Sequence, residues 1–233
     1  MSTSTLLPSA SALGKFSPAW LASLDGSDLQ SLETVLAAEI DQKCKQDALY
    51  WLQTWTATEN PNHQQQGLEF RAPFPKKSYF GPLFEAFRTE SRLFIPKTRE
   101  MLTSWCVMGD SAHQAQWERW FIVVQTDAEA KAEELIEYVR ILYRNQPEYL
   151  RRLHPLKGEG SRTNIEWEDG GRVLAIPKGV NKIRLYHPTR YVMDEAAFLP
   201  ESEQCFNAAH PVSHQIIAIS SAGPGWFGDQ CSL

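Results

Sequence analysis

Long apolar runs are missing from this sequence. The longest, such as the run from Trp120 to Val124, are far shorter than the roughly 20 residues that a membrane-spanning helix needs. Residues 1 to 12 have neither a basic start nor an apolar core, so they do not read as a secretory signal. We therefore expect a cytoplasmic protein.

Cysteine is scarce and scattered. The four cysteines include no C-x-x-C pair; they are Cys44, Cys106, Cys205 and Cys231. This pattern favours free thiols over a disulfide framework, and it argues against a zinc site built on sulfur.

An excess of positive charge is also absent. The formal net charge is −5, which argues against indiscriminate coating of nucleic acid but leaves room for a local basic surface. Two groups of residues could form one: Arg151, Arg152 and Lys157, or Lys178, Lys182 and Arg184. The alternative is a solvated face of mixed charge.

The first 60 residues predict a leader followed by a helical extension. Residues 1 to about 30 are rich in Ser, Ala, Leu and Gly, and we expect them to be loosely ordered. Residues 27 to 56 carry apolar side chains at helical spacing, with Ser27 as a possible N-cap. We predict two helices there, separated near residues 42 to 45, and then a loop over 57 to 77.

Residues 61 to 233 predict an α/β domain with a mostly parallel central sheet flanked by helices, because short apolar runs alternate with longer amphipathic ones. The expected strands are 93–96, 120–125, 191–193 and 215–220. Residues 127–145 predict a helix capped by Asp127. Residues 164–176 predict a hairpin around Asp169-Gly170-Gly171.

The stretch IPKTREMLTSW, residues 95 to 105, has the layout of a phosphate-binding loop without glycines. A phosphate chain needs backbone N–H groups at a helix start, a nearby cation and a hydroxyl that helps to hold Mg²⁺. Lys97 and Arg99 supply cations, and Thr103 or Ser104 supplies the hydroxyl. The alternative is an ordinary basic loop before a helix, which is common.

Two later segments add acids and hydroxyls. The strand in RYVMDEAAF ends in Asp194-Glu195. Such a pair of acids is suited to NTP hydrolysis, with Asp194 near Mg²⁺ and Glu195 deprotonating the attacking water. The alternative is an acidic helix start. In QIIAISSAGPGWF, a strand runs into Ser220-Ser221, a position suited to sensing a γ-phosphate; alone, it is an ordinary strand and turn.

Taken in order, these segments resemble the ATPase part of the large terminase subunit of tailed phages, the motor that packages DNA. Residues 97 to 105 are similar to that family's deviant Walker A motif, K-x-R-Q-M-G-x-S-W, with Glu100 for Gln and Leu102 for Gly. VMDEAAF is similar to its Walker B strand, and Ser220-Ser221-Ala222-Gly223-Pro224 to its coupling motif. The resemblance covers about residues 46 to 228.

The resemblance implies a RecA-like P-loop NTPase that binds ATP and Mg²⁺ and hydrolyses ATP. Glu195 would be catalytic, Asp194 and Ser104 would hold the metal, and Ser220 and Ser221 would couple hydrolysis to movement. The implied nucleotide-binding residues are Lys97, Thr98, Arg99, Glu100, Met101, Leu102, Thr103, Ser104 and, in the segment expected to contact adenine, Tyr79.

Two residues carry particular expectations from the resemblance. Arg184 stands where an arginine finger would reach a neighbouring subunit's nucleotide; the alternative is a surface arginine in a loop. Leu102 replaces a glycine that lets backbone approach phosphate, and its Cβ makes a positive φ costly. Either the loop takes ordinary φ there, or nucleotide affinity is reduced.

The resemblance also implies partners: double-stranded DNA, a portal protein, a terminase small subunit and further copies of the chain in a ring on the procapsid. The family's C-terminal nuclease has no counterpart before Leu233, so we expect no nuclease activity. The alternative function is a truncated, non-hydrolysing assembly protein from a decayed or split prophage gene. The K-x-R and D-E-A-A-F motifs make a helicase-type translocase a poor alternative.

Overall fold

The computed structural model describes residues 25–59, 70–98, 101–223 and 225–232. No helix within these ranges is long and apolar enough to cross a membrane. Residues 1–24 of the expected leader lie outside the described residues, as do Arg99, Glu100 and Pro224. The rest of that leader, from residue 26 to about residue 30, is helical rather than loosely ordered. The proposed division near residue 60 stays a prediction.

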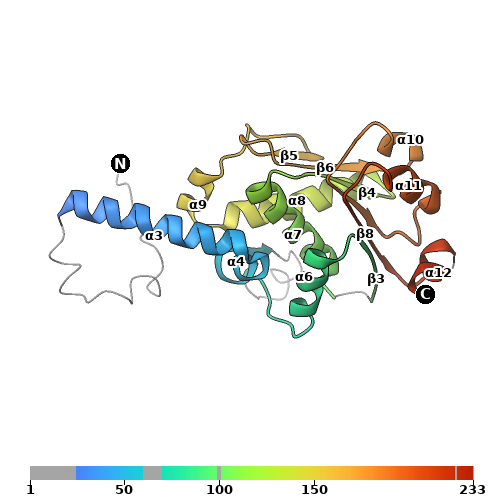
Figure 1. Cartoon of the computed structure of the whole chain (residues 1–233), viewed down its shortest axis with the longest axis horizontal. Helices are drawn as coiled ribbons and strands as arrows, with labels where there is room; N and C mark the ends of the chain where they lie inside the picture. Colours follow the sequence, from blue (N-terminus) through green and yellow to red (C-terminus); the bar gives the residue numbers. More distant parts are fainter. Residues whose placement is uncertain (1–24, 60–69, 99–100, 224, 233) are drawn as a thin grey trace.

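A mostly parallel sheet organises the body (Figure 1), as the sequence predicted. Among the described residues its strands lie in the order β3-β8-β7-β4-β6-β5, and all neighbours are parallel except β5 and β6. The strands are β3 (Arg92–Lys97), β4 (Phe121–Thr126), β5 (Asn164–Glu166), β6 (Arg172–Pro177), β7 (Arg190–Asp194) and β8 (Gln215–Ser221).

The central strands are buried on both faces, which explains why they are apolar without alternation. Val192 and Ile217 contribute to one core, whereas their neighbours Tyr191 and Ile216 contribute to the other. The first core lies beneath α6 (Phe80–Thr89), α7 (Thr103–Glu118) and α8 (Glu129–Asn145). The second lies beneath α10 (Val180–Ile183), α11 (Ser202–Ala209) and α12 (Trp226–Cys231). Figure 1 shows these two groups of helices on opposite sides of the sheet.

Two helices precede the sheet, α3 (Gly26–Gln46) and α4 (Ala48–Trp55), and α3 projects from the body (Figure 1). They divide at Asp47, two residues beyond the predicted break, because its carboxylate accepts a hydrogen bond from the Tyr50 amide at 2.8 Å and caps α4. Asp25, rather than Ser27, caps α3. The end of α3 and all of α4 pack on the first core, where Trp51 is buried.

Three other details differ from the sequence prediction. The expected loop over 57–77 contains β1 (Ala57–Glu59) and β2 (Arg71–Pro73), which pair antiparallel and are too short to show periodicity. Asp127 does not cap α8, because the N-cap of that helix is Ala128. The Asp127 carboxylate instead accepts a hydrogen bond from the Thr126 hydroxyl. The hairpin over 164–176 is confirmed, but its second strand also pairs in parallel with β4. A further short helix, α9 (Glu148–Leu153), precedes it.

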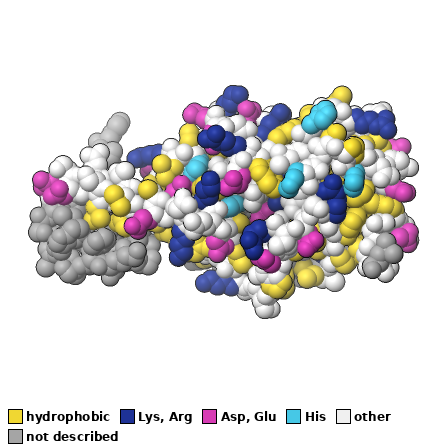
Figure 2. Space-filling view, in the orientation of Figure 1, with side chains coloured by type: hydrophobic (Ala, Val, Ile, Leu, Met, Phe, Trp, Pro, Cys, Tyr) yellow, Lys and Arg dark blue, Asp and Glu magenta, His cyan; other side chains and the backbone are white. Residues whose placement is uncertain are grey.

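The surface has mixed charge. Figure 2 shows Lys and Arg side chains interspersed with Asp and Glu over the visible face of the body. Arg152 pairs with Glu148, and Lys157 Nζ lies 2.9 Å from Glu166 Oε1, so a mixed-charge face describes the first group of basic residues. In the second group, Arg184 makes no ion pair with the rest of the described chain.

Candidate functional site

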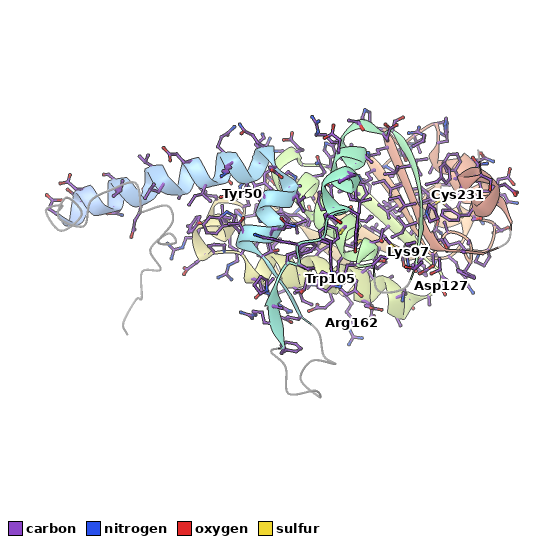
Figure 3. The ribbon with its side chains drawn as sticks, turned by 90° about the horizontal axis from the view of Figure 1, so that it is seen from below. Tyr50, Lys97, Trp105, Asp127, Arg162 and Cys231 are labelled. Carbon is purple, nitrogen blue, oxygen red and sulfur yellow. The ribbon has the colours of Figure 1, made fainter. Side chains whose placement is uncertain are left out.

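The three sequence segments meet at one edge of the sheet. β3, β8 and β7 are neighbouring parallel strands, so their carboxyl ends lie side by side. Lys97 is in register with Ser221, and Asp194 is in register with Ile219. Ligands of open α/β sheets bind outside the carboxyl ends of the strands. Figure 3 labels Lys97 at this edge, together with Asp127 beyond the end of β4.

An ion pair joins the first segment to the second. Lys97 Nζ lies 2.5 Å from Glu195 Oε1, and the two side chains are only 11% and 24% exposed. Partial burial makes such a pair stronger than one at the surface, because less solvent screens it. The cation expected to bind phosphate and the carboxylate expected to act on water are therefore in direct contact.

The third segment holds the other oxygen of the same carboxylate. Glu195 Oε2 accepts from the Ser221 amide at 3.1 Å and from the Ser220 hydroxyl at 3.3 Å. Ser220 Oγ in turn accepts from the Ala197 amide at 3.1 Å. Both carboxylate oxygens are thus fixed, and the end of β8 determines where Glu195 points.

The two adjacent acids have shifted pKa values of opposite sign. Burial raises the pKa of Asp194 to about 6, and the neighbouring Glu195 charge adds to this effect. Burial also raises the pKa of Glu195, but the hydrogen bonds from Lys97 and Ser221 outweigh it, so that pKa lies below its usual value. Glu195 is therefore ionised at neutral pH, and Asp194 is the acid that gains most from a nearby cation.

Helix α7 brings a hydroxyl to Asp194. Ser104, in its first turn, donates to Asp194 Oδ1 at 3.1 Å. The helix begins at Thr103, as predicted, and its N-cap Leu102 provides no side-chain hydrogen bond. The first amides of a helix lack intrahelical partners and carry partial positive charge, so this helix start favours an anion.

Leu102 adopts the left-handed backbone conformation, with φ 55° and ψ 19°. The sequence left open an ordinary φ at this position, and the structure does not take it. The backbone at this position thus has a conformation that glycine would adopt without cost. The leucine side chain is half-buried and packs against the first core. Glu195 is also left-handed, with φ 52°. Such strain persists only where the surrounding structure enforces it.

Tyr79, for which the resemblance implied a contact with adenine, lies against the loop before α7; the adenine contact stays a prediction. Its hydroxyl donates to the Met101 carbonyl at 2.9 Å and so ties the start of α6 to the residue before Leu102. At the other end of the loop, the Thr98 amide lies 3.4 Å from Met101 Sδ. Arg99 and Glu100, between them, lie outside the described residues.

Arg184 is not part of this cluster. It is the exposed C-cap of α10, in the connection that leads from the end of β6 to the beginning of β7. Its expected action on a neighbouring subunit stays a prediction.

Sequence reasoning missed two contributions from the segment after β4. Lys131, in the first turn of α8, lies near enough to Asp194 to lower its pKa against the effect of burial. Tyr138, on the same helix, stacks on Trp105 with ring centroids 4.1 Å apart and an interplanar angle of 16°. The signal was available, because β4 was predicted as a parallel strand and its carboxyl end must reach the same edge.

The site lacks the donors of a resident metal centre. No group of three or more His, Cys, Asp or Glu side chains in the described residues could hold a metal ion. Ser104 and Asp194 supply a hydroxyl and one carboxylate. That set suits Mg²⁺ bound together with substrate phosphates, because Mg²⁺ is commonly held by one or two carboxylates and completed by water and phosphate oxygens.

Comparison with known proteins gives a likeness in structure only. No model of a known protein family matches the chain, and no curated protein matches it. The HK97 bacteriophage large terminase superimposes with a TM-score of 0.55 at 8% sequence identity, over 77% of this chain and 38% of that one. The fold is that of the matched part of a phage large terminase.

A second terminase gives weaker superpositions. The large terminase ATPase domain of Thermus phage P74-26 has a TM-score of 0.48 at 14% identity, over 73% of this chain and 72% of that domain. An arginine-to-alanine mutant of the same domain gives 0.42 at 16% identity. The likeness to the HK97 protein agrees with the α/β architecture and mostly parallel sheet expected from the sequence, and the RecA-like assignment stays a prediction. The chain spans well under half the length of the HK97 protein.

Proposed function

We propose that this chain is an ATP hydrolase and that it acts as the ATPase of a viral DNA-packaging motor. The observation that supports this best is the convergence of Lys97, Ser104, Asp194 and Glu195 at the carboxyl edge of three adjacent parallel strands. The terminase-like fold supports it independently.

Lys97 and the start of α7 would bind the phosphates. The Lys97 ammonium lies at the end of β3, and the unpartnered amides of α7 begin one short loop later. A triphosphate placed between them would compete with Glu195 for the ammonium, since that group is 2.5 Å from the carboxylate. Nucleotide entry therefore requires Lys97 to exchange one anionic partner for another, which releases Glu195.

Ser104 and Asp194 would hold Mg²⁺. When bound, the ion would neutralise charge that develops on the phosphates. The pKa of about 6 at Asp194 fits this role, because a buried carboxylate with a raised pKa gains free energy from an adjacent cation.

Glu195 would be the general base. In hydrolysis the oxygen of a water forms a bond to the γ-phosphorus, the bond from that phosphorus to the bridging β–γ oxygen breaks, and ADP leaves. The water's proton goes to the Glu195 carboxylate, which is ionised at neutral pH; after Lys97 has moved to the phosphates, the hydrogen bonds from Ser220 and Ser221 still act to lower its pKa.

Ser220 and Ser221 would couple this chemistry to movement. Both contact Glu195 Oε2 from the end of β8, so a shift of that strand end moves the base. The work done would be translocation of double-stranded DNA into a procapsid, by a ring of copies in which Arg184 acts on the neighbouring subunit. A portal protein and a terminase small subunit would be the other partners, in the bacterial host's cytoplasm and then on the procapsid.

One observation favours a second candidate, a non-hydrolysing terminase-like assembly protein. Leu102 places a side chain where close approach of backbone to phosphate calls for glycine, and it holds that place at positive φ. Weak or absent nucleotide binding would follow.

Equilibrium binding of a fluorescent ATP analogue with Mg²⁺ separates the two candidates. The ATPase predicts saturable binding by the intact chain, a large loss in Lys97→Met and little change in Lys182→Met, a control that removes an exposed lysine elsewhere. An absence of binding at millimolar nucleotide would favour the assembly protein.

A further inference from the structure

Helix α8 begins beside the carboxyl end of β7. β4 and β7 are parallel neighbours, and Gln125 near the end of β4 is in register with Met193, the residue before Asp194. α8 starts at Glu129, directly after the short connection that follows β4, in which Figure 3 labels Asp127. The first turn of α8 therefore lies at the edge of the sheet that carries the candidate ATP site.

Three side chains of α8 form a row on one face of the helix. They are Lys131, Glu134 and Tyr138, whose spacing of three and four residues places them one above the other. The Tyr138 hydroxyl donates to Glu134 Oε1 at 2.6 Å, and Lys131 Nζ lies 3.8 Å from Glu134 Oε2. Glu134 thus links an aromatic ring at one end of the row to a cation at the other.

An aromatic contact turns this row toward Asp194. Tyr138 stacks on Trp105, the residue after Ser104, and the Ser104 hydroxyl donates to Asp194 Oδ1 at 3.1 Å. Burial is the main cause of the raised pKa values of Tyr138 and Asp194; the Asp194 charge adds to the first, and the Lys131 charge opposes the second. Both ends of the row therefore act on the same carboxylate, and the face that carries Lys131 is turned to the site.

Lys131 can change its partner more easily than Lys97, the other described lysine whose charge acts on Asp194. Lys97 is 11% exposed and lies 2.5 Å from Glu195, whereas Lys131 is 44% exposed and lies 3.8 Å from its acid. A half-exposed pair of this kind contributes little to stability, because solvent screens it. Tyr138 still holds Glu134 when Lys131 leaves, so the lysine can move to another anion at small cost.

The site has a use for such a cation. Asp194 and Glu195 place two carboxylates beside the position proposed for the triphosphate, and Lys97 is already bound to one of them. Mg²⁺ would balance only part of the charge that the phosphates bring.

We propose that Lys131 is a second phosphate-binding residue of the candidate ATP site and that it contacts phosphate oxygens on the Asp194 side of the phosphate chain. This inference rests on the proposed function, because it takes nucleotide to bind at this edge. A lysine suits the role, since its flexible stem carries a compact charge that can follow the phosphates.

Equilibrium binding of the fluorescent ATP analogue with Mg²⁺ to the intact chain tests this proposal. Lys131→Met removes the cation, and Lys131→Arg keeps it. Lys45→Met is the matched control, because Lys45 is 43% exposed and lies 3.5 Å from Glu118. Glu118 is the last residue of α7, roughly 22 Å from the start of that helix in the site.

A fourth variant separates a phosphate contact from the helix ion pair. Glu134→Gln breaks the same pair as Lys131→Met but keeps the lysine, and its amide oxygen can still accept from Tyr138. It should bind nucleotide at least as tightly as the wild type, because it leaves Lys131 without a competing anion.

Lys131→Met should weaken binding by about tenfold or more, since it removes a charge-assisted hydrogen bond. Lys131→Arg should lie closer to the wild type than to Lys131→Met, and Lys45→Met should stay within about twofold of the wild type, as expected for a remote exposed pair. Circular dichroism checks that each variant folds.

Three results would overturn the assignment of Lys131 and leave the proposed ATPase function intact. They are an unchanged affinity in Lys131→Met, an equal loss in Glu134→Gln, which would trace the effect to the broken pair, and an equal loss in Lys45→Met, which would trace it to overall charge. An absence of binding by the wild type would overturn both proposals.

Discussion

Replacement of Leu102 by glycine and by alanine tests the strain in the loop before α7. A residue with a Cβ costs roughly 1–2 kcal/mol in the left-handed region, and Leu102 is held there with φ 55°. Glycine removes that cost but loses about 0.5–1 kcal/mol through the greater entropy of its unfolded chain. Both replacements lose the packing of the half-buried leucine, so this loss cancels in the comparison.

The glycine variant should therefore be more stable than the alanine variant by about 0.5–1 kcal/mol. Urea unfolding, followed by tryptophan fluorescence, measures the difference. Ala38, exposed within α3, is the matched control, because there glycine should be less stable than alanine by about 1 kcal/mol. An alanine variant at 102 that equals or exceeds the glycine variant in stability would refute the strain argument.

Two further predictions concern buried charges. The raised pKa of Asp194 means that the folded state binds a proton more tightly than the unfolded state, so this group makes stability fall as pH rises from about 4 to 6. Asp194→Asn should remove that destabilising contribution, which is worth up to about 3 kcal/mol above pH 6. Urea unfolding of the variant and the wild type from pH 4 to 7.5 should show that the variant's advantage in unfolding free energy grows with pH. An advantage that does not change with pH would contradict the raised pKa. Arg190→Met leaves the buried Asp110 charge without its partner and should cost about 3–5 kcal/mol. Arg88→Met breaks an exposed pair and should cost far less; equal losses in thermal unfolding would contradict this ranking.

The sequence was most informative where strand direction alone determines position. Parallel strands bring their carboxyl ends to one edge, so the residues after three apolar runs had to gather there. That argument correctly placed Lys97, Asp194 and Ser220 on one edge of the sheet. It needed only the strand assignments, which buried apolar runs make clear.

The sequence did not predict which side chains pair or where the shortest strands lie. Whether Lys97 pairs with Glu195 depends on rotamers and on competing hydrogen bonds from Ser221, none of which leaves a periodic signal. β1 and β2 have three residues each, too few for a pattern. The left-handed backbone at Leu102 was posed as one of two outcomes, because a leucine gives no sign of positive φ.

The buried ion pair between Asp110 and Arg190 could not be predicted from the sequence either. Asp110 and His113 look like ordinary polar residues of an amphipathic helix, but α7 is buried over nearly its whole surface. Only the packing of α7 against the first residue of β7 shows that Asp110 pairs with Arg190 at 2.7 Å.

The most direct test of the proposed function is phosphate release from ATP by the wild-type chain and by Glu195→Gln, with Mg²⁺ and in parallel with nucleotide binding. The wild type should hydrolyse ATP, and the variant should lose at least about 100-fold in rate, because a general base contributes that much or more. The variant should still bind nucleotide, since glutamine keeps the shape of the side chain and weakens the competition for Lys97. Undiminished hydrolysis by Glu195→Gln would contradict the account.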